Sequence, residues 1–146
     1  MNYLIYASQA ARPMRSEDLA DLLESSRKRN GENEITGLLI YKASLSGDDH
    51  GYFMQLLEGP SSALAATRTR IEADPRHRNM VVFEEGDSEA RSFGDWSMAF
   101  RHVDQDDLAA MEGFADLGSP TFWSRARSGD LPDALDMMRW FAKEDV

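Results

Sequence analysis

The order of short apolar segments along the chain limits the fold to a few topologies. Five segments are typical of buried strands, because they are short and rich in β-branched or aromatic residues. They cover residues 3–8, 35–41, 52–57, 80–83 and 96–103. Two segments with helical spacing of apolar residues separate the first strand from the second and the third from the fourth. The predicted order is therefore β-α-β-β-α-β-β.

The two helical segments carry their own start and stop signals. In the first, Ser16 is the predicted N-cap, acidic residues follow in the first turn, and the helix is expected to end near residues 30–31. The second has apolar residues at Leu64, Ala65 and Ile71, and Pro75 is expected to stop it. Between the second and third strands, residues 42–51 are polar and rich in turn formers, which predicts a hairpin with a long solvated loop.

This order matches the α+β, ferredoxin-like class: one βαββαββ sheet with both helices on one face. From Asp104 onward the apolar spacing becomes helical, with Pro132 and Gly129 bounding the last segment. We therefore expect a domain at 1–103 and a helical extension at 104–146 whose short helices pack on the sheet. Those helices are also the expected output surface, although they would serve equally well as a simple cover.

Composition excludes several functions. The formal charge of −10 repels nucleic acid and anionic membranes, and the absence of cysteine removes disulfides and thiol catalysis. The N-terminus has no signal-peptide pattern and no apolar run could span a bilayer, so we expect a cytoplasmic protein. The three histidines lack metal-ligand spacing, and no phosphate loop or Ser-His-Asp motif is present.

Three polar residues stand where a plain core would not require them. Gln55 interrupts the apolar third strand, Tyr6 ends the first strand, and Asn30 closes the first helix. A buried amide is costly unless its donors and acceptor are paired, which suggests a site. Taken singly, each also has an ordinary explanation: an amide on an exposed sheet face, a core tyrosine with a paired hydroxyl, and a helix terminator.

Taken together, the motifs around these residues resemble the BLUF family, blue-light sensors that use flavin. They occur in the family's order over about the first two-thirds of the chain. The motifs are LIYAS at 4–8, Asn30 followed by ITGLL at 35–39, FMQLLEG at 53–59, DPRH at 74–77 and FGDWSM at 93–98.

The resemblance implies a role for each matching residue. Tyr6 matches the photoactive tyrosine, Gln55 the glutamine between that tyrosine and the flavin ring, and Asn30 the asparagine beside the pyrimidine part of the ring. Trp96 and Met98 match a pair on the fifth strand whose placement varies in the family.

The remaining implied contacts lie around the ring. Ser8 matches a small polar residue near the Trp96–Met98 pair, Arg76 an arginine near the C2 carbonyl, and Arg70 and His77 are candidates for the ribityl or phosphate end. A flat ring also needs an apolar wall. The candidates for that wall are Leu22, Leu39 and Ile71. FAD is the family's usual cofactor, with FMN and riboflavin as alternatives.

The implied mechanism is a hydrogen-bond switch. Excited flavin takes an electron and then a proton from Tyr6 through Gln55, and the amide is left rearranged, because only an amide can exchange its donor and acceptor roles. Arg29 departs from the histidine or asparagine of many relatives, so the adjacent ring contact is expected to differ.

We expect a photoreceptor with no fused effector and no turnover reaction, which signals through a protein partner or through self-association of its C-terminal helices. Two alternatives stay open: a ferredoxin-like ligand-binding or oligomerisation module without photochemistry, and a flavin or small-molecule enzyme.

Overall fold

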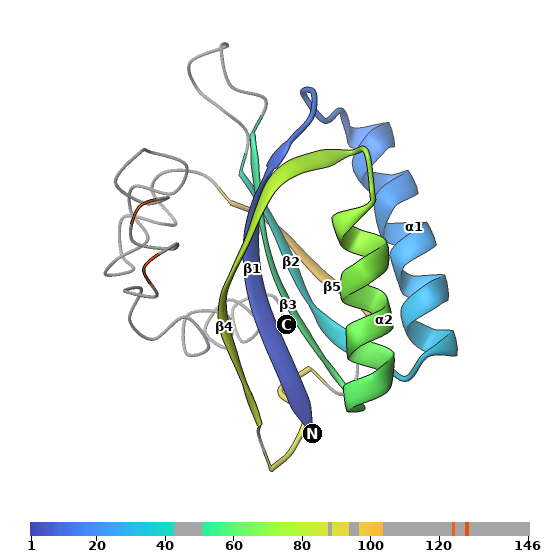
Figure 1. Cartoon of the computed structure of the whole chain (residues 1–146). Coiled ribbons are helices and arrows are strands. Elements are labelled where there is room, and N and C mark those ends of the chain that lie inside the picture. The colour runs from blue at the N-terminus through green and yellow to red at the C-terminus, as the bar shows by residue number, and fades with distance from the viewer. Residues whose placement is uncertain (43–50, 88, 94–96, 104–123, 125–127, 129–146) are drawn as a thin grey trace.

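The computed structural model describes residues 1–42, 51–87, 89–93, 97–103, 124 and 128. The predicted order of strands and helices is confirmed within these residues (Figure 1). The elements are β1 (Asn2–Ala10), α1 (Ser16–Glu32), β2 (Thr36–Lys42), β3 (Tyr52–Gly59), α2 (Ser61–Glu72), β4 (His77–Asp87) and β5 (Ala99–Val103).

The five strands form one sheet in the order β4-β1-β3-β2-β5. β3 pairs antiparallel with β1 and β2, β4 pairs antiparallel with β1, and β5 runs parallel to β2. Every residue of the central β3 is buried, which explains its unbroken apolar pattern. This arrangement confirms the predicted ferredoxin-like α+β class.

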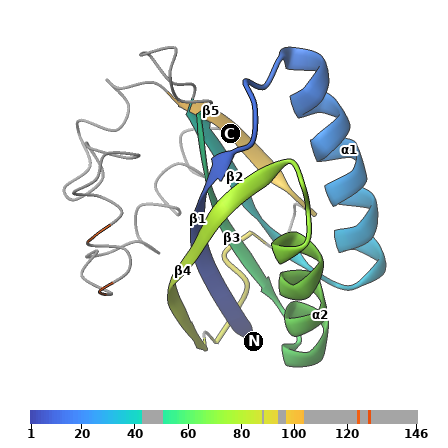
Figure 2. The same cartoon turned by 45° about the horizontal axis from the view of Figure 1, so that its top comes forward.

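Both helices cover the same face of the sheet, as the two views show (Figures 1 and 2). Side chains alternate between faces along a strand, so a register pair places its two side chains on one face. Tyr6 and Gln55 are such a pair, as are Leu39 and Gln55. All three therefore face the helices, within a core that includes Leu4, Leu19, Leu57, Leu64 and Met98.

Close packing of β2 against β3 depends on a glycine. A Cβ at Gly37 would lie 2.0 Å from the carbonyl oxygen of Leu56, which is far inside van der Waals contact. Only a residue without a side chain permits this approach. The glycine in the ITGLL motif is thus explained by sheet packing.

On the opposite face, Glu58 of β3 is 1% exposed and makes a network of its own. Its carboxylate accepts hydrogen bonds from Thr36 Oγ1 (2.9 Å), Ser92 N (2.8 Å) and Phe93 N (2.7 Å). Arg91 donates to Thr36 Oγ1 at 2.9 Å and to the Glu34 carbonyl at 2.7 Å. These bonds fix the segment 91–93 against the ends of β2 and β3.

The ends of β1, β2 and β3 shift by one or two residues from the sequence expectation, and three further boundaries also differ. β4 runs from His77 to Asp87 instead of 80–83, because it pairs with β1 along nearly its whole length although its ends are polar. β5 begins at Ala99 instead of residue 96. Ser16 is the first residue of α1 and Arg15 is the N-cap, whose backbone N–H donates to Asp18 Oδ2 at 2.9 Å.

Several expectations concern residues outside the described part of the chain. These are most of the loop at 42–51, Trp96, and the helical extension at 104–146. Within the described part, neither helix is long and apolar enough to cross a membrane.

Candidate functional site

Tyr6 and Gln55 form the centre of the site. They lie side by side on β1 and β3, and the Tyr6 hydroxyl donates a hydrogen bond to Gln55 Oε1. Both side chains are buried, with 4% and 5% exposed. Burial raises the pKa of the Tyr6 hydroxyl well above its usual range, and the nearby charge of Asp74 raises it further while Arg76 opposes the rise. Tyr6 is therefore a neutral donor at physiological pH.

The other end of the Gln55 amide contacts Met98. Gln55 Nε2 donates to Met98 Sδ at 3.4 Å, and Met98 is 1% exposed immediately before β5. The amide thus bridges a hydroxyl on β1 and a thioether beside β5. The structure shows Met98 inside the core; its expected partner Trp96 lies outside the described residues.

A cavity opens beside this pair, between the sheet and the two helices. It is partly open to solvent and is lined by both apolar and polar side chains, as small-molecule pockets are. Its lining residues are Tyr6, Leu22, Ser26, Arg29, Asn30, Leu39, Phe53, Gln55, Leu57, Thr67, Arg70, Ile71, Asp74, Arg76 and His77. Nine of the residues expected from sequence (Tyr6, Leu22, Asn30, Leu39, Gln55, Arg70, Ile71, Arg76 and His77) are in this wall.

Asn30 forms part of the α1 side of the cavity. Its side chain is 4% exposed, and Nδ2 donates to the Ser97 carbonyl at 2.7 Å. Its side-chain oxygen accepts no hydrogen bond from the described residues. A buried amide oxygen without a partner is costly, so the cavity wall offers an acceptor to a ligand N–H group.

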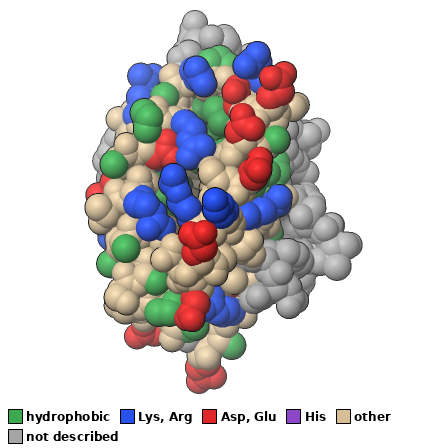
Figure 3. All heavy atoms as spheres, turned by 90° about the vertical axis from the view of Figure 1, so that its right-hand side faces the viewer, with side chains coloured by type: hydrophobic (Ala, Val, Ile, Leu, Met, Phe, Trp, Pro, Cys, Tyr) green, Lys and Arg blue, Asp and Glu red, His purple; other side chains and the backbone are tan. Residues whose placement is uncertain are grey.

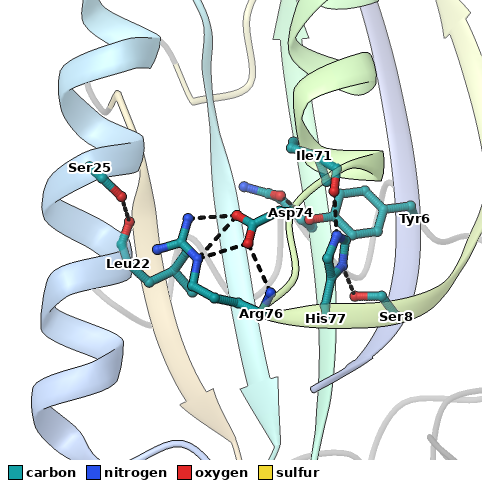
Figure 4. Close-up of polar contacts among 9 residues, drawn as sticks. Tyr6, Ser8, Leu22, Ser25, Ile71, Asp74, Arg76 and His77 are labelled. Atoms are coloured by element: carbon teal, nitrogen blue, oxygen red, sulfur yellow. Dashed lines mark hydrogen bonds and ion pairs between the residues drawn. The ribbon is translucent and has the colours of Figure 1, made fainter. Parts of the chain in front are cut away.

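The mouth of the cavity carries an ion pair. Arg76 Nη2 lies 2.6 Å from Asp74 Oδ2, and Arg76 Nε lies 3.0 Å from Asp74 Oδ1 (Figure 4). Burial acts to raise the pKa of Asp74, but the hydrogen bonds from Arg76 outweigh it and hold that pKa below its usual value. Arg76 is thus largely engaged by Asp74, whereas the guanidinium of Arg70 donates only to Thr67 Oγ1, at 3.2 Å, among the described residues.

Basic side chains gather near the middle of the helix-bearing side of the molecule (Figure 3). Arg29, Arg70 and Arg76 line the cavity, although the chain as a whole is strongly acidic. Among the described residues, Arg29 and Arg70 have no carboxylate within ion-pair distance. The mouth of the cavity therefore favours a ligand that carries acceptors or negative charge.

Ser8, like Met98, is a described candidate that lies outside the cavity wall. It is fully buried on β1, and its Oγ lies 2.7 Å from His77 Nδ1 (Figure 4). His77 Nε2 faces the Ile71 carbonyl, which can only accept, so Nε2 carries a proton. Ser8 thus orients the histidine that forms the adjacent wall.

Apart from Arg29, which the sequence already placed beside an expected ring contact, five wall residues were not expected, and most follow from periodicity. Phe53 and Leu57 lie two positions from Gln55 on β3, and Ser26 and Thr67 lie four positions before Asn30 and Ile71 on their helices. Residues at these spacings share a face. Asp74 follows α2 directly and has no such signal.

These observations define a class: a ferredoxin-like domain with a small-molecule cavity between its sheet and both helices. Comparison with known proteins identifies the family. The model of BLUF, sensors of blue-light using FAD, matches residues 1–99. The chain belongs to the BLUF family, whose members are blue-light photoreceptors that use flavin.

Individual relatives are consistent with this. Photoactivated adenylate cyclase subunit beta of Euglena longa is 34% identical over 96 residues, which are 65% of this chain and 10% of that protein. The blue light- and temperature-regulated antirepressor BluF of Escherichia coli is 29% identical over 122 residues, 82% of this chain and 28% of that protein. The chain thus spans about a tenth of the length of the cyclase relative.

Among solved structures, the dark state of BlrB, described as a BLUF protein, aligns with a TM-score of 0.70 and 29% identity, and the alignment covers 99% of this chain and 96% of BlrB. The ground state of BlsA aligns with a TM-score of 0.66 and 28% identity, over 99% of this chain and 87% of BlsA.

The cavity fits the family's flavin. A flavin ring is flat and apolar on its faces and carries one N–H donor and several acceptors on its edges. The apolar side chains of Leu22, Leu39 and Ile71 suit its faces, and the Asn30 oxygen suits its N–H edge. Arginines at the mouth suit its carbonyls or phosphates.

Proposed function

We propose that this chain senses blue light by reversing the side-chain amide of Gln55. The single observation that carries the proposal is the buried bridge Tyr6–Gln55–Met98, of which Tyr6 and Gln55 line the cavity. A flavin held in this cavity would supply the absorption of blue light and an acceptor for one electron from a nearby donor. Tyr6 is the donor we assign, because it lines the cavity and its proton has an acceptor already in place.

Tyr6 performs the first step. In the dark, burial keeps its hydroxyl protonated. A phenol that has lost an electron becomes a strong acid, so the proton moves along the existing hydrogen bond to Gln55 Oε1. When the electron returns, the proton returns to Tyr6, and we assign the net change to Gln55.

Gln55 stores the change. An amide has a donor end and an acceptor end, and the Tyr6 hydroxyl can bond to either one. After rotation or tautomerisation, Gln55 presents the opposite hydrogen-bonding atoms to Tyr6, to the cavity and to Met98. Altered hydrogen bonding to the chromophore shifts its absorption slightly to the red, and the dark arrangement returns thermally.

The binding roles we propose follow the wall. Asn30 accepts from the ring N–H, and Leu22, Leu39 and Ile71 pack on the ring. We favour Arg70 over Arg76 for a ring carbonyl, because Asp74 already engages Arg76. His77, held by Ser8, supports the wall beside Tyr6. FAD is the cofactor; the wall also admits FMN or riboflavin.

We propose that the output is a protein interaction and that the domain itself catalyses no turnover, because Tyr6 and Gln55 occupy the inner wall of the cavity. The signal leaves through Met98 into β5 and reaches residues 104–146, which we propose as a separate helical extension. Comparison of oligomeric state in darkness and under illumination tests this output.

The decisive test is an absorption spectrum before and after blue light. We expect a small reversible red shift without bleaching. Tyr6→Phe should keep the flavin and its yellow colour but abolish the shift, because the donor is gone. Tyr41→Phe is the matched control, since Tyr41 is also buried on the helix face but does not line the cavity.

A normal shift in Tyr6→Phe would contradict the mechanism. Protein that stays colourless after flavin addition would favour a module without photochemistry, and steady turnover of a substrate by the flavoprotein would favour an enzyme.

A further inference from the structure

Arg27 on α1 does not line the cavity, yet it contacts the residue that Gln55 touches. Its Nε donates to the Met98 carbonyl at 2.9 Å. Asn30, three residues later on the same helix, donates to the Ser97 carbonyl at 2.7 Å. Residues three apart lie on one face of a helix, so α1 holds two successive carbonyls of the chain.

These two carbonyls immediately precede β5. Pairing of β5 with β2 begins at Ala99, opposite Leu38. Before Ala99, where strand pairing is absent, side chains of α1 therefore supply the hydrogen bonds that fix the backbone around Met98. Met98 is consequently held twice: its carbonyl by Arg27 and its sulfur by Gln55 Nε2.

We propose that Arg27 is a positioning residue that sets the lifetime of the light state by holding Met98 against Gln55. The inference rests on the proposed function of Gln55. Once the amide has reversed, its oxygen faces the Met98 sulfur, which has no proton to donate. While Arg27 holds Met98 in place, the unfavourable contact between the amide oxygen and the sulfur persists, and the amide returns faster to its dark arrangement. Without Arg27, Met98 can move away from the amide oxygen, and the light state lasts longer.

Because of its position, Arg27 can be replaced without changing the residues that line the cavity. Arg27 is exposed overall and is absent from the cavity wall, so replacing it should leave flavin binding and the fold intact. Lys28, next to it on α1, is also exposed and cationic and has no hydrogen bond to the described part of β5 or the residues before it. Lys28→Ala is therefore the control for loss of charge.

The experiment measures, by absorption, the thermal recovery of the flavin-loaded chain of residues 1–146 after a blue-light pulse. Arg27→Ala should show the wild-type dark spectrum and red shift but recover roughly two- to tenfold more slowly, the range expected for loss of one hydrogen bond. Arg27→Lys, which keeps a cationic N–H donor group, should restore part of the rate. Lys28→Ala should recover at the wild-type rate.

The outcomes separate the two proposals. A wild-type red shift with equal or faster recovery in Arg27→Ala would overturn the role of Arg27 alone. Equal slowing in Lys28→Ala would also overturn it, because charge and not the Met98 contact would then be responsible. Absence of a red shift in the wild type would overturn the function of Gln55 and, with it, this inference.

Discussion

Two buried polar side chains on β3, Gln55 and Glu58, differ in what their surroundings permit. Both are at most 5% exposed, and their odd spacing places them on opposite faces of the sheet. Glu58 accepts three hydrogen bonds, two of them from backbone N–H groups. Gln55 bridges one hydroxyl and one thioether.

The difference lies in the partners. An ionised carboxylate only accepts, and a backbone N–H only donates, so the Glu58 network has a single arrangement. The Tyr6 hydroxyl both donates and accepts, so the Gln55 amide has two. A buried polar group on this strand is thus a fixed anchor or a switch according to its partners, and replacing each group should produce opposite kinds of effect.

The largest effect we expect follows replacement of Gln55. Gln55→Leu keeps a similar volume but removes both hydrogen-bonding ends, so the reversible red shift should be lost completely while flavin stays bound. Light-minus-dark absorption spectra check this, with flavin content as the control. A shift of wild-type size would show that the amide is not the switch.

Replacement of Glu58 should act on stability instead. Glu58→Ala leaves buried N–H donors without an acceptor and should lower the free energy of unfolding by about 2–4 kcal/mol. Glu58→Gln should cost less, because one oxygen still accepts while its NH₂ group meets an N–H donor.

Urea unfolding of the flavin-loaded proteins checks both variants, and their red shift should keep its wild-type size. Wild-type stability in Glu58→Ala would show that the carboxylate is not an anchor. Loss of the red shift in folded Glu58→Gln would contradict the assignment of stability to Glu58 and of the light response to Gln55.

The smallest effect concerns the partly exposed pair at the cavity mouth. Arg76 lowers the pKa of Asp74, so this pair stabilises the fold above the unfolded carboxyl pKa of about 3.9, and the stabilisation is lost as the pH falls through the lower folded pKa. Asp74→Asn should therefore reduce stability near pH 7 by at most about 1 kcal/mol.

The difference between wild type and Asp74→Asn should shrink as the pH falls below about 4. Thermal unfolding measured from neutral to acidic pH checks the trend. A difference that grows toward low pH would contradict the assigned sign.

The candidate site was predictable where periodicity or motif spacing specifies it. Alternation along β1 and β3 places Tyr6 and Gln55 toward the same helices, and helical spacing brings Leu22 and Asn30 to one side of α1. The length of β4 was not predictable, because its polar ends adopt strand structure only as a result of pairing with β1. Trp96 and the C-terminal segment stay predictions.

The hydrogen-bond partners of Glu58 and Arg27 could not be predicted from the sequence either. Glu58 meets Ser92 and Phe93 across more than thirty positions, and Arg27 meets Met98 across 71. No local pattern relates such residues, because chain folding and not spacing brings them together.

The sequence by itself determined the order of the elements, the ferredoxin-like class, and the presence of an amide on the central strand, because apolar periodicity and turn residues act locally. Only the tertiary structure decided that this amide lies between Tyr6 and Met98, that Asp74 pairs with Arg76, and that α1 holds the two residues before β5. Those facts depend on strand register and helix placement, which are set by packing of the whole core.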